Sequence, residues 1–211
     1  MKNGPLFFLG LFSALGISWA GLVIGINTQL GGLSPYFDEA QEAAFPARIP
    51  GIAEQGLRVY RDLGCASCHT QQVRRPGFGA DQARGWGERQ SVARDYIYQS
   101  QPQLGTMRIG PDLANYGTRA EEAGRTPAAV LADLYNGHAG MPAYRFLFAQ
   151  RKLDGEPSAK ALVGGAPAGY ELVPTARAEA LVAYLLSLKQ SYDLPEAMPY
   201  EPADSTKEAA Q

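Results

Sequence analysis

The first strong pattern along the chain is an uninterrupted apolar run near its N-terminal end. Residues 5–26 contain no charged side chain. At a rise of 1.5 Å per residue, a helix of this length spans about 33 Å, which is enough to cross the hydrocarbon core of a membrane. A cleaved signal peptide is the alternative, but its apolar region is usually shorter, and the only cleavage-like site is a poor match at residues 18–20. We therefore predict an uncleaved transmembrane anchor over residues 1–28.

The charges on either side of this run predict its orientation. Lys2 is the only charge before it, whereas Asp38, Glu39 and Glu42 follow it. By the positive-inside rule, the N-terminus lies in the cytoplasm and the rest of the chain lies on the periplasmic side of a bacterial inner membrane. Small residues recur on one face of the helix: Gly10, Ala14, Ser18, Gly21 and Gly25. They either form a packing face for another helix or reflect the ordinary composition of membrane helices.

Two amphipathic patterns further along predict helices that pack on each other. The first covers residues 52–63 and ends at Gly64, and the second covers residues 176–192. The second helix carries one apolar stripe, made of Leu181, Tyr184, Leu185 and Leu188. A small residue, Gly56, and an aromatic one, Tyr60, would let the first helix cross the second closely.

These patterns divide the chain into four parts. After the anchor we predict a linker over residues 29–50 and a mainly α domain over residues 51–192. Within the domain, residues 150–175 form an insertion that we interpret as a surface hairpin or extended loop. The polar composition of residues 193–211 predicts a disordered tail. A formal net charge of −2 gives no basic excess that would indicate a nucleic-acid partner.

Both cysteines of the chain lie in one short segment, Cys65-Ala-Ser-Cys68-His69. C-x-x-C-H is the attachment signature of c-type haem. Two thiols add to the vinyl groups of one porphyrin, and the adjacent histidine lies under the iron. A disulfide or a redox dithiol leaves His69 unexplained, and a zinc site would need about four ligands. We therefore predict one covalently bound haem c, held by Cys65 and Cys68, with His69 as an iron ligand.

The second axial ligand has four candidates in the sequence: Met107, Met141, Met198 and His138. Met141 lies between a glycine and a proline, in an irregular loop that can turn a side chain inward. Met107 is close to the loop on the histidine side, Met198 lies in the tail, and His138 is typical of a surface histidine. We predict Met141 as the ligand. Iron held by histidine and methionine has no open position, which predicts electron transfer without catalysis by this chain.

Arginine is unusually frequent around this motif. Residues 70–125 contain eight arginines and no lysine. Haem propionates need partners, and the planar guanidinium group matches a carboxylate. Arg74, Arg75 and the indole N–H of Trp86 are our candidates for this role. The alternative is that these arginines form an ordinary charged surface.

C-x-x-C-H flanked by two such helices resembles the class I cytochromes c. The resemblance implies that Met141 occupies the position of the distal methionine in those proteins. It also covers "RIGPDLANYG" at residues 108–117. By that resemblance the Pro111 carbonyl accepts a hydrogen bond from the His69 ring, and Leu113 packs on the porphyrin. The expected fold is therefore a mainly α class I cytochrome c domain with a single N-terminal transmembrane helix.

Longer motifs narrow the resemblance to one family. The single anchor, "GLRVYRDLGCASCHTQQVR", "RDYIYQSQPQLGTMRIGPDLANYGTR" and "GMPAYRFL" resemble the membrane-anchored mono-haem cytochrome c subunit (subunit II) of cbb3-type cytochrome c oxidases, over roughly residues 5–150. The resemblance implies a non-catalytic electron-transfer subunit beside a haem–copper catalytic subunit. It also implies a further c-type cytochrome subunit or a soluble cytochrome donor. "TQQVRRPG" and "LGTMRI" depart from the family pattern and indicate a divergent member.

Two other functions are compatible with one membrane anchor and one haem c. The small cytochrome c subunit of a nitric oxide reductase also has one anchor and one haem c, and a free-standing anchored electron shuttle would need no complex. The "R-x-GPDL" and "GMPAY" elements favour the oxidase. The small-residue face of the anchor argues weakly against the shuttle.

Overall fold

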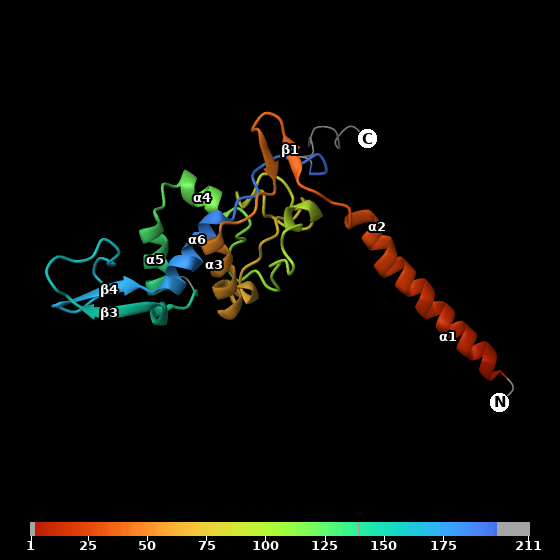
Figure 1. The fold of residues 1–211 in the computed structure, drawn as a ribbon, viewed down its shortest axis with the longest axis horizontal. Coiled ribbons are helices and arrows are strands. Elements are labelled where there is room, and N and C mark those ends of the chain that lie inside the picture. The colour runs from red at the N-terminus through yellow and green to blue at the C-terminus, as the bar shows by residue number, and fades with distance from the viewer. Residues whose placement is uncertain (1–2, 139, 198–211) are drawn as a thin grey trace, which may run out of the picture.

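The computed structural model describes residues 3–138 and 140–197. A long N-terminal helix extends away from a mainly helical domain, which the rest of the described chain forms (Figure 1). This confirms the predicted fold class, a mainly α domain preceded by one apolar helix.

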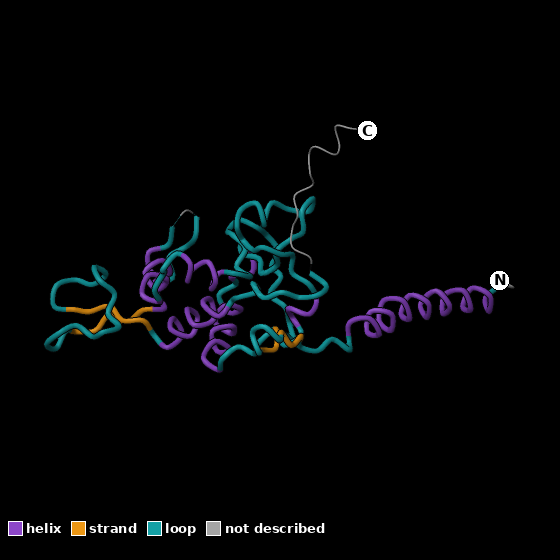
Figure 2. Tube along the Cα trace, turned by 90° about the horizontal axis from the view of Figure 1, so that it is seen from above, coloured by secondary structure: helices purple, strands orange, loops and turns teal. Residues whose placement is uncertain are grey.

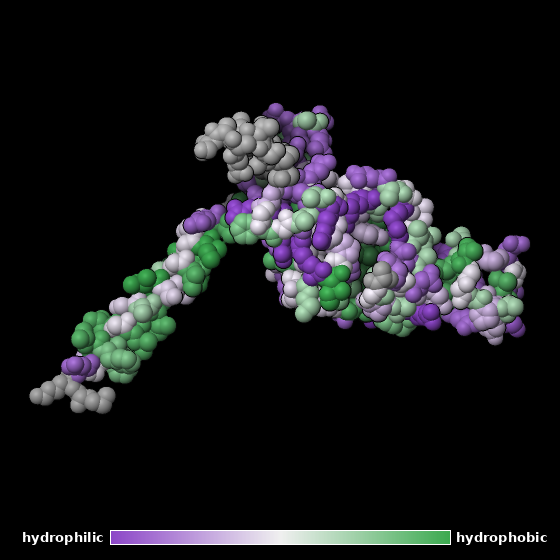
Figure 3. Space-filling view, turned by 180° about the vertical axis from the view of Figure 1, so that it is seen from behind, coloured by the Kyte–Doolittle hydropathy of each residue, from purple (hydrophilic) through white to green (hydrophobic). Residues whose placement is uncertain are grey.

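The N-terminal helix consists of α1 (Gly4–Trp19), a π-helical turn (Ala20–Gly25) and α2 (Ile26–Leu30). Together they form 27 continuous residues with a mean hydropathy of 2.0, long and apolar enough to cross a membrane. Apolar side chains cover most of its visible surface (Figure 3). The helix continues two residues beyond the predicted anchor. The π turn contains Gly21 and Gly25, two of the five small residues noted in the sequence.

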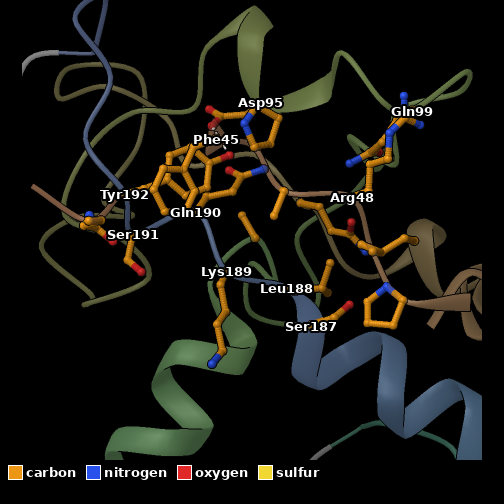
Figure 4. Close-up of a pocket in the computed structure, with 17 residues that line it drawn as sticks. Phe45, Arg48, Asp95, Gln99, Ser187, Leu188, Lys189, Gln190, Ser191 and Tyr192 are labelled. Atoms are coloured by element: carbon orange, nitrogen blue, oxygen red, sulfur yellow. Dashed lines mark hydrogen bonds between the residues drawn. The ribbon is translucent and has the colours of Figure 1, made fainter. Parts of the chain in front are cut away.

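The predicted linker contains a hairpin that packs on the domain. Strands β1 (Tyr36–Asp38) and β2 (Ala43–Phe45) pair antiparallel. At the end of β2, the Phe45 ring stacks on the Tyr192 ring with their centroids 4.6 Å apart (Figure 4). Arg94 donates a hydrogen bond to the Ser34 carbonyl, just before the hairpin. Residues 34–45 are therefore held against the domain.

The core forms where α3 (Gly51–Asp62) crosses α6 (Ala176–Ser187). The Tyr60 and Tyr184 rings meet edge to face with centroids 5.4 Å apart. The predicted apolar residues are all buried: Leu181, Tyr184 and Leu185 lie on α6, and Leu188 follows its end. Two shorter helices, α4 (Tyr116–Glu122) and α5 (Pro127–Asn136), pack against α6. Short 3₁₀ turns lie at Cys65–Ser67, Ala93–Tyr96 and Arg145–Leu147.

The prediction that the last helix reaches Tyr192 is wrong by five residues. Leu188 has an extended backbone, with φ −75° and ψ 93°. Its carbonyl accepts a hydrogen bond from the Gly117 N–H at 2.8 Å, and the Gln190 N–H donates to Asn115 Oδ1 at 2.8 Å. These bonds to the start of α4 replace the helical ones. Apolar periodicity alone does not reveal such a competition.

Of the two structures that we considered for the insertion, a hairpin or an extended loop, the protein has a hairpin. Strands β3 (Phe148–Lys152) and β4 (Tyr170–Pro174) pair antiparallel. Both ribbon views place this hairpin at the end of the molecule opposite the anchor (Figures 1 and 2). Leu172 and Val173 of β4 are buried and tie the hairpin to the domain.

The predicted disordered tail begins too early. Leu194 and Ala197 are buried in a small apolar cluster with Tyr192, against which Phe45 packs. Residues 193–197 therefore belong to the domain. The rest of the predicted tail, including Met198, lies outside the described residues.

Candidate functional site

The C-x-x-C-H segment follows directly from the end of α3. Gly64 has a left-handed backbone (φ +69°), which ends the helix and starts the turn at Cys65–Ser67. The Cys65 carbonyl accepts hydrogen bonds from the N–H groups of Cys68 (3.2 Å) and His69 (2.9 Å). This compact turn directs both thiols and the imidazole into one cavity. Burial raises the pKa of the Cys65 thiol to about 11, so this thiol is protonated at neutral pH.

The cavity has a volume of about 720 Å³. Its walls come from the C-x-x-C-H turn, the loop before α4, the helices α4 and α5, and the loop after α5. Much of the lining is apolar: Leu63, Ile109, Leu113, Val130, Leu134 and Leu185. Cys65, Cys68, His69 and Met141 all line this single space. A cavity of this size and character is typical of a cofactor site.

The His69 imidazole is held in one orientation. Its Nδ1 lies 2.9 Å from the carbonyl oxygen of Pro111. A carbonyl only accepts, so Nδ1 carries the proton and Nε2 keeps a free lone pair for a metal. A Cβ at Gly110 would lie 2.3 Å from His69 Cε1, so any side chain there would displace the ring. Pro111 and Leu113, which we named from the resemblance, both line the cavity.

A buried carboxylate fixes the loop that carries Pro111. Asp112 is fully buried. One of its oxygens accepts hydrogen bonds from Thr70 Oγ1 at 2.5 Å and the Gln72 N–H at 2.8 Å, and the other accepts from the Ala114 N–H at 2.8 Å. The chain just after His69 is thereby joined to the loop that orients its ring.

Two of the four candidates for a second axial ligand reach the cavity. Met141 and His138 both line it, and the Met141 N–H donates to the His138 carbonyl at 2.7 Å. Met107 is 58% exposed and lies outside the cavity lining. Met198 is outside the described residues. A thioether and an imidazole are therefore the side chains that this loop offers.

The arginines that reach the cavity are not the ones we predicted. Trp86 lines it, but Arg74 and Arg75 are exposed and do not. Arg119 and Arg125 line it instead, from α4 and the residues just after it. Arg119 lies on α4 and Arg125 lies beyond its end, so no single helical repeat relates the two positions and the sequence pattern did not single them out.

Arg119 is a partly buried cation held by neutral groups. Its two terminal nitrogens donate to the carbonyls of Trp86 at 2.9 Å and Asp112 at 2.6 Å. Burial lowers the pKa of Arg119 below its ordinary value, although the carboxylate of Asp112 opposes that shift. Arg125 pairs with Asp133, which also lines the cavity. A partly desolvated guanidinium group in a cavity wall attracts an anionic group of a ligand.

The donor set fits a haem of the c type. Two thiols, one imidazole with a free Nε2 and one thioether face an apolar cavity that also offers a guanidinium group. Among residues 3–138 and 140–197, no three histidine, cysteine or acidic side chains gather in a way that would hold a separate metal ion. The cysteines therefore have no zinc-type ligand set around them.

Comparison with known protein families identifies a family that this chain matches. The family model described as cytochrome c oxidase, mono-haem subunit/FixO, matches residues 48–171, which is more than half of the 211-residue chain. The matched range begins just before α3 and ends within β4, so it includes the whole C-x-x-C-H segment, the "GPDL" loop and Met141. No curated protein matches the chain.

Proposed function

Since the chain belongs to the FixO family of mono-haem cytochrome c oxidase subunits, we propose that it carries electrons through one covalently bound haem c to the haem–copper subunit of a cbb3-type oxidase. The observation that carries this proposal is the cavity that Cys65, Cys68, His69 and Met141 line together. When bound, the haem would supply one-electron chemistry. In this proposal the chain transfers electrons and performs no catalysis itself.

Each site residue has a defined role in this proposal. Cys65 and Cys68 would hold the haem through thioether bonds, and His69 Nε2 and the Met141 thioether would be the iron ligands. The hydrogen bond from His69 Nδ1 to the Pro111 carbonyl fixes the ring and makes Nε2 a stronger donor. The apolar lining, including Leu113, excludes water.

The propionates need a separate assignment. Arg119 and Trp86 are the candidates that line the cavity, and Arg125 is a third. Arg74 and Arg75, our candidates from the sequence, are replaced in this role by Arg119 and Arg125.

The membrane arrangement follows from the N-terminal helix. In this proposal residues 4–30 cross the inner membrane once, with the N-terminus in the cytoplasm and the haem domain in the periplasm. The catalytic subunit lies beside it, and a further c-type cytochrome subunit or a soluble cytochrome supplies electrons. The family description names a cytochrome c oxidase subunit, which favours this function over a nitric oxide reductase subunit or a free-standing shuttle.

Haem staining after denaturation tests the cofactor. The purified chain should keep a stain that is lost in the Cys65→Ser, Cys68→Ser double variant. Covalent haem that persists in that variant would refute the attachment. Gentle detergent purification tests the partner. Haem b and copper in the co-purifying subunit support an oxidase, whereas haem b with non-haem iron would mean a nitric oxide reductase.

A further inference from the structure

Residues 70–120 expose more cationic than anionic side chains. Residues 70–120 contain four carboxylates: Asp81, Glu88, Asp95 and Asp112. Only Glu88 is exposed, since the other three are at most 5% exposed. Over the same range Arg74, Arg75 and Arg84 are exposed. Although the chain has a net charge of −2, these three arginines form no ion pair within residues 3–138 and 140–197.

The exposed arginines share a loop, residues 74–84, which we call the basic loop. It also exposes a large aromatic side chain, Phe78, which is 64% exposed and lies under the Arg75 guanidinium group, 4.2 Å from ring centroid to Cζ. An apolar centre with cations around it is the usual composition of a surface that meets another protein.

The basic loop folds around a buried carboxylate within it. Asp81, which is 1% exposed, accepts a hydrogen bond from the Arg74 N–H at 2.7 Å and pairs with Arg108. Its own carbonyl accepts from the Trp86 N–H at 2.9 Å. The loop is thus fixed to the same segment that supplies Trp86 to the cavity wall.

Trp86 connects this surface with the cavity. Trp86 lines the cavity, and the exposed Arg84 guanidinium group lies over the Trp86 ring, 4.9 Å from its centroid. The Trp86 carbonyl also accepts from Arg119, the cation in the cavity wall. Trp86 therefore contacts both the exposed Arg84 and the cavity.

We propose that the basic loop and Trp86 form the docking surface for a soluble electron-carrier protein with an acidic face. The proposal rests on the electron-transfer function above and identifies the chemistry of its partner. Permanent subunit interfaces are more apolar than this surface, whereas transient redox encounters are small and steered by opposite charges. The loop exposes arginines and no carboxylate, because Asp81 is buried, so the carrier must bring the carboxylates.

The experiment measures how fast the full-length haem-loaded chain in detergent accepts electrons from reduced flavodoxin, a small acidic carrier. The test variant is Arg75→Glu, Arg84→Glu. The matched control is Arg151→Glu, Lys152→Glu, which reverses two exposed cations on β3, at the end opposite the anchor. We expect the second-order rate constant to fall about tenfold or more in the test variant, to stay within about twofold in the control, and to lose most of this difference at high salt.

Equal losses in both variants, or rates that do not depend on salt, would overturn the proposal. It is also overturned if the test variant no longer co-purifies with the catalytic subunit, because the loop would then be a permanent interface. Haem staining of each sample distinguishes a failure of the proposed function from a failure of the docking-surface proposal. A wild-type chain without covalent haem refutes the proposed function, whereas a stained but charge-insensitive chain refutes only the docking surface.

Discussion

Gly56 in α3 and Ala180 in α6 approach so closely that a Cβ at Gly56 would lie 1.9 Å from the Ala180 carbonyl oxygen. The same Cβ would meet the Tyr184 side chain at 2.6 Å. Backbone therefore packs directly on backbone where the two helices cross. The cavity depends on this crossing, because α3 leads directly into the C-x-x-C-H turn and α6 contributes Leu185 to the lining.

We expect Gly56→Ala to destabilise the protein by about 1–3 kcal/mol or more, since the helices must separate to admit the methyl group. Gly51→Ala, at the start of the same helix, is the control, because a Cβ there meets no atom within 4 Å. Thermal unfolding followed by circular dichroism measures both. Equal melting temperatures for the two variants would show that the crossing tolerates a side chain.

The sequence predicts the parts of the fold that depend on periodic burial. The apolar stripe of α6 and the small residue in α3 are both visible as patterns, and the structure confirms them. The end of α6 and the position of residues 193–197 depend on single long-range bonds, such as that between Gln190 and Asn115, which leave no periodic signal. At the site, C-x-x-C-H can be recognised because its residues are adjacent in sequence. Which arginine lines the cavity, Arg74 or Arg119, depends on the direction in which a loop folds, and the sequence pattern does not reveal that direction.

Met141→Ala should leave haem attached through the two cysteines, because attachment does not involve the distal side. We expect the weak near-infrared sulfur-to-iron band of the oxidised protein to disappear and the reduction potential to fall, since the thioether is lost. Met107→Ala is the control, because Met107 is exposed and outside the cavity lining. A band that survives in the first variant and vanishes in the second would assign the ligand to Met107.

Asp95 and Arg89 form a buried ion pair with two hydrogen bonds, of 2.7 and 3.0 Å, and Tyr192 donates a third to Asp95 at 2.8 Å. Asp95→Ala leaves the guanidinium group buried without its partner, which should cost about 3–5 kcal/mol of stability. Asp62→Ala removes an exposed partner of Arg177 and should cost about 0–1 kcal/mol. Denaturant unfolding compares the two, and equal losses would contradict the burial argument.

Burial raises the pKa of Tyr184 to about 12 from its ordinary value of about 10, against the opposing hydrogen bond to Gln71. Between these values the folded state keeps a proton that the unfolded state loses. Stability should therefore fall as pH rises from about 10 to 12, by up to about 1.4 kcal/mol per pH unit for this group. Tyr184→Phe should show a shallower decline when unfolding free energy is measured across that range. An unchanged slope would mean that Tyr184 does not contribute to it.

Phe45→Ala removes the ring that stacks on Tyr192 and should release the β1–β2 hairpin from the domain. We expect limited proteolysis within residues 31–50 to become several-fold faster, because cleavage requires a locally unfolded chain. Phe37→Ala is the control, since that ring is 58% exposed on β1. Similar cleavage rates in both variants would show that the stacking does not hold the hairpin.

The docked hairpin has a consequence for how far the domain can travel. A flexible linker of 20 residues has a root-mean-square end-to-end distance of roughly 25 Å. A domain joined to the membrane helix by such a linker would sample a wide volume above the bilayer. Here the contacts of Ser34 and Phe45 shorten the free chain to the few residues after Leu30. In the proposed membrane arrangement, this short connection limits how far the cavity can move from the membrane surface. A partner held in the same membrane would find it by rotation and lateral diffusion alone.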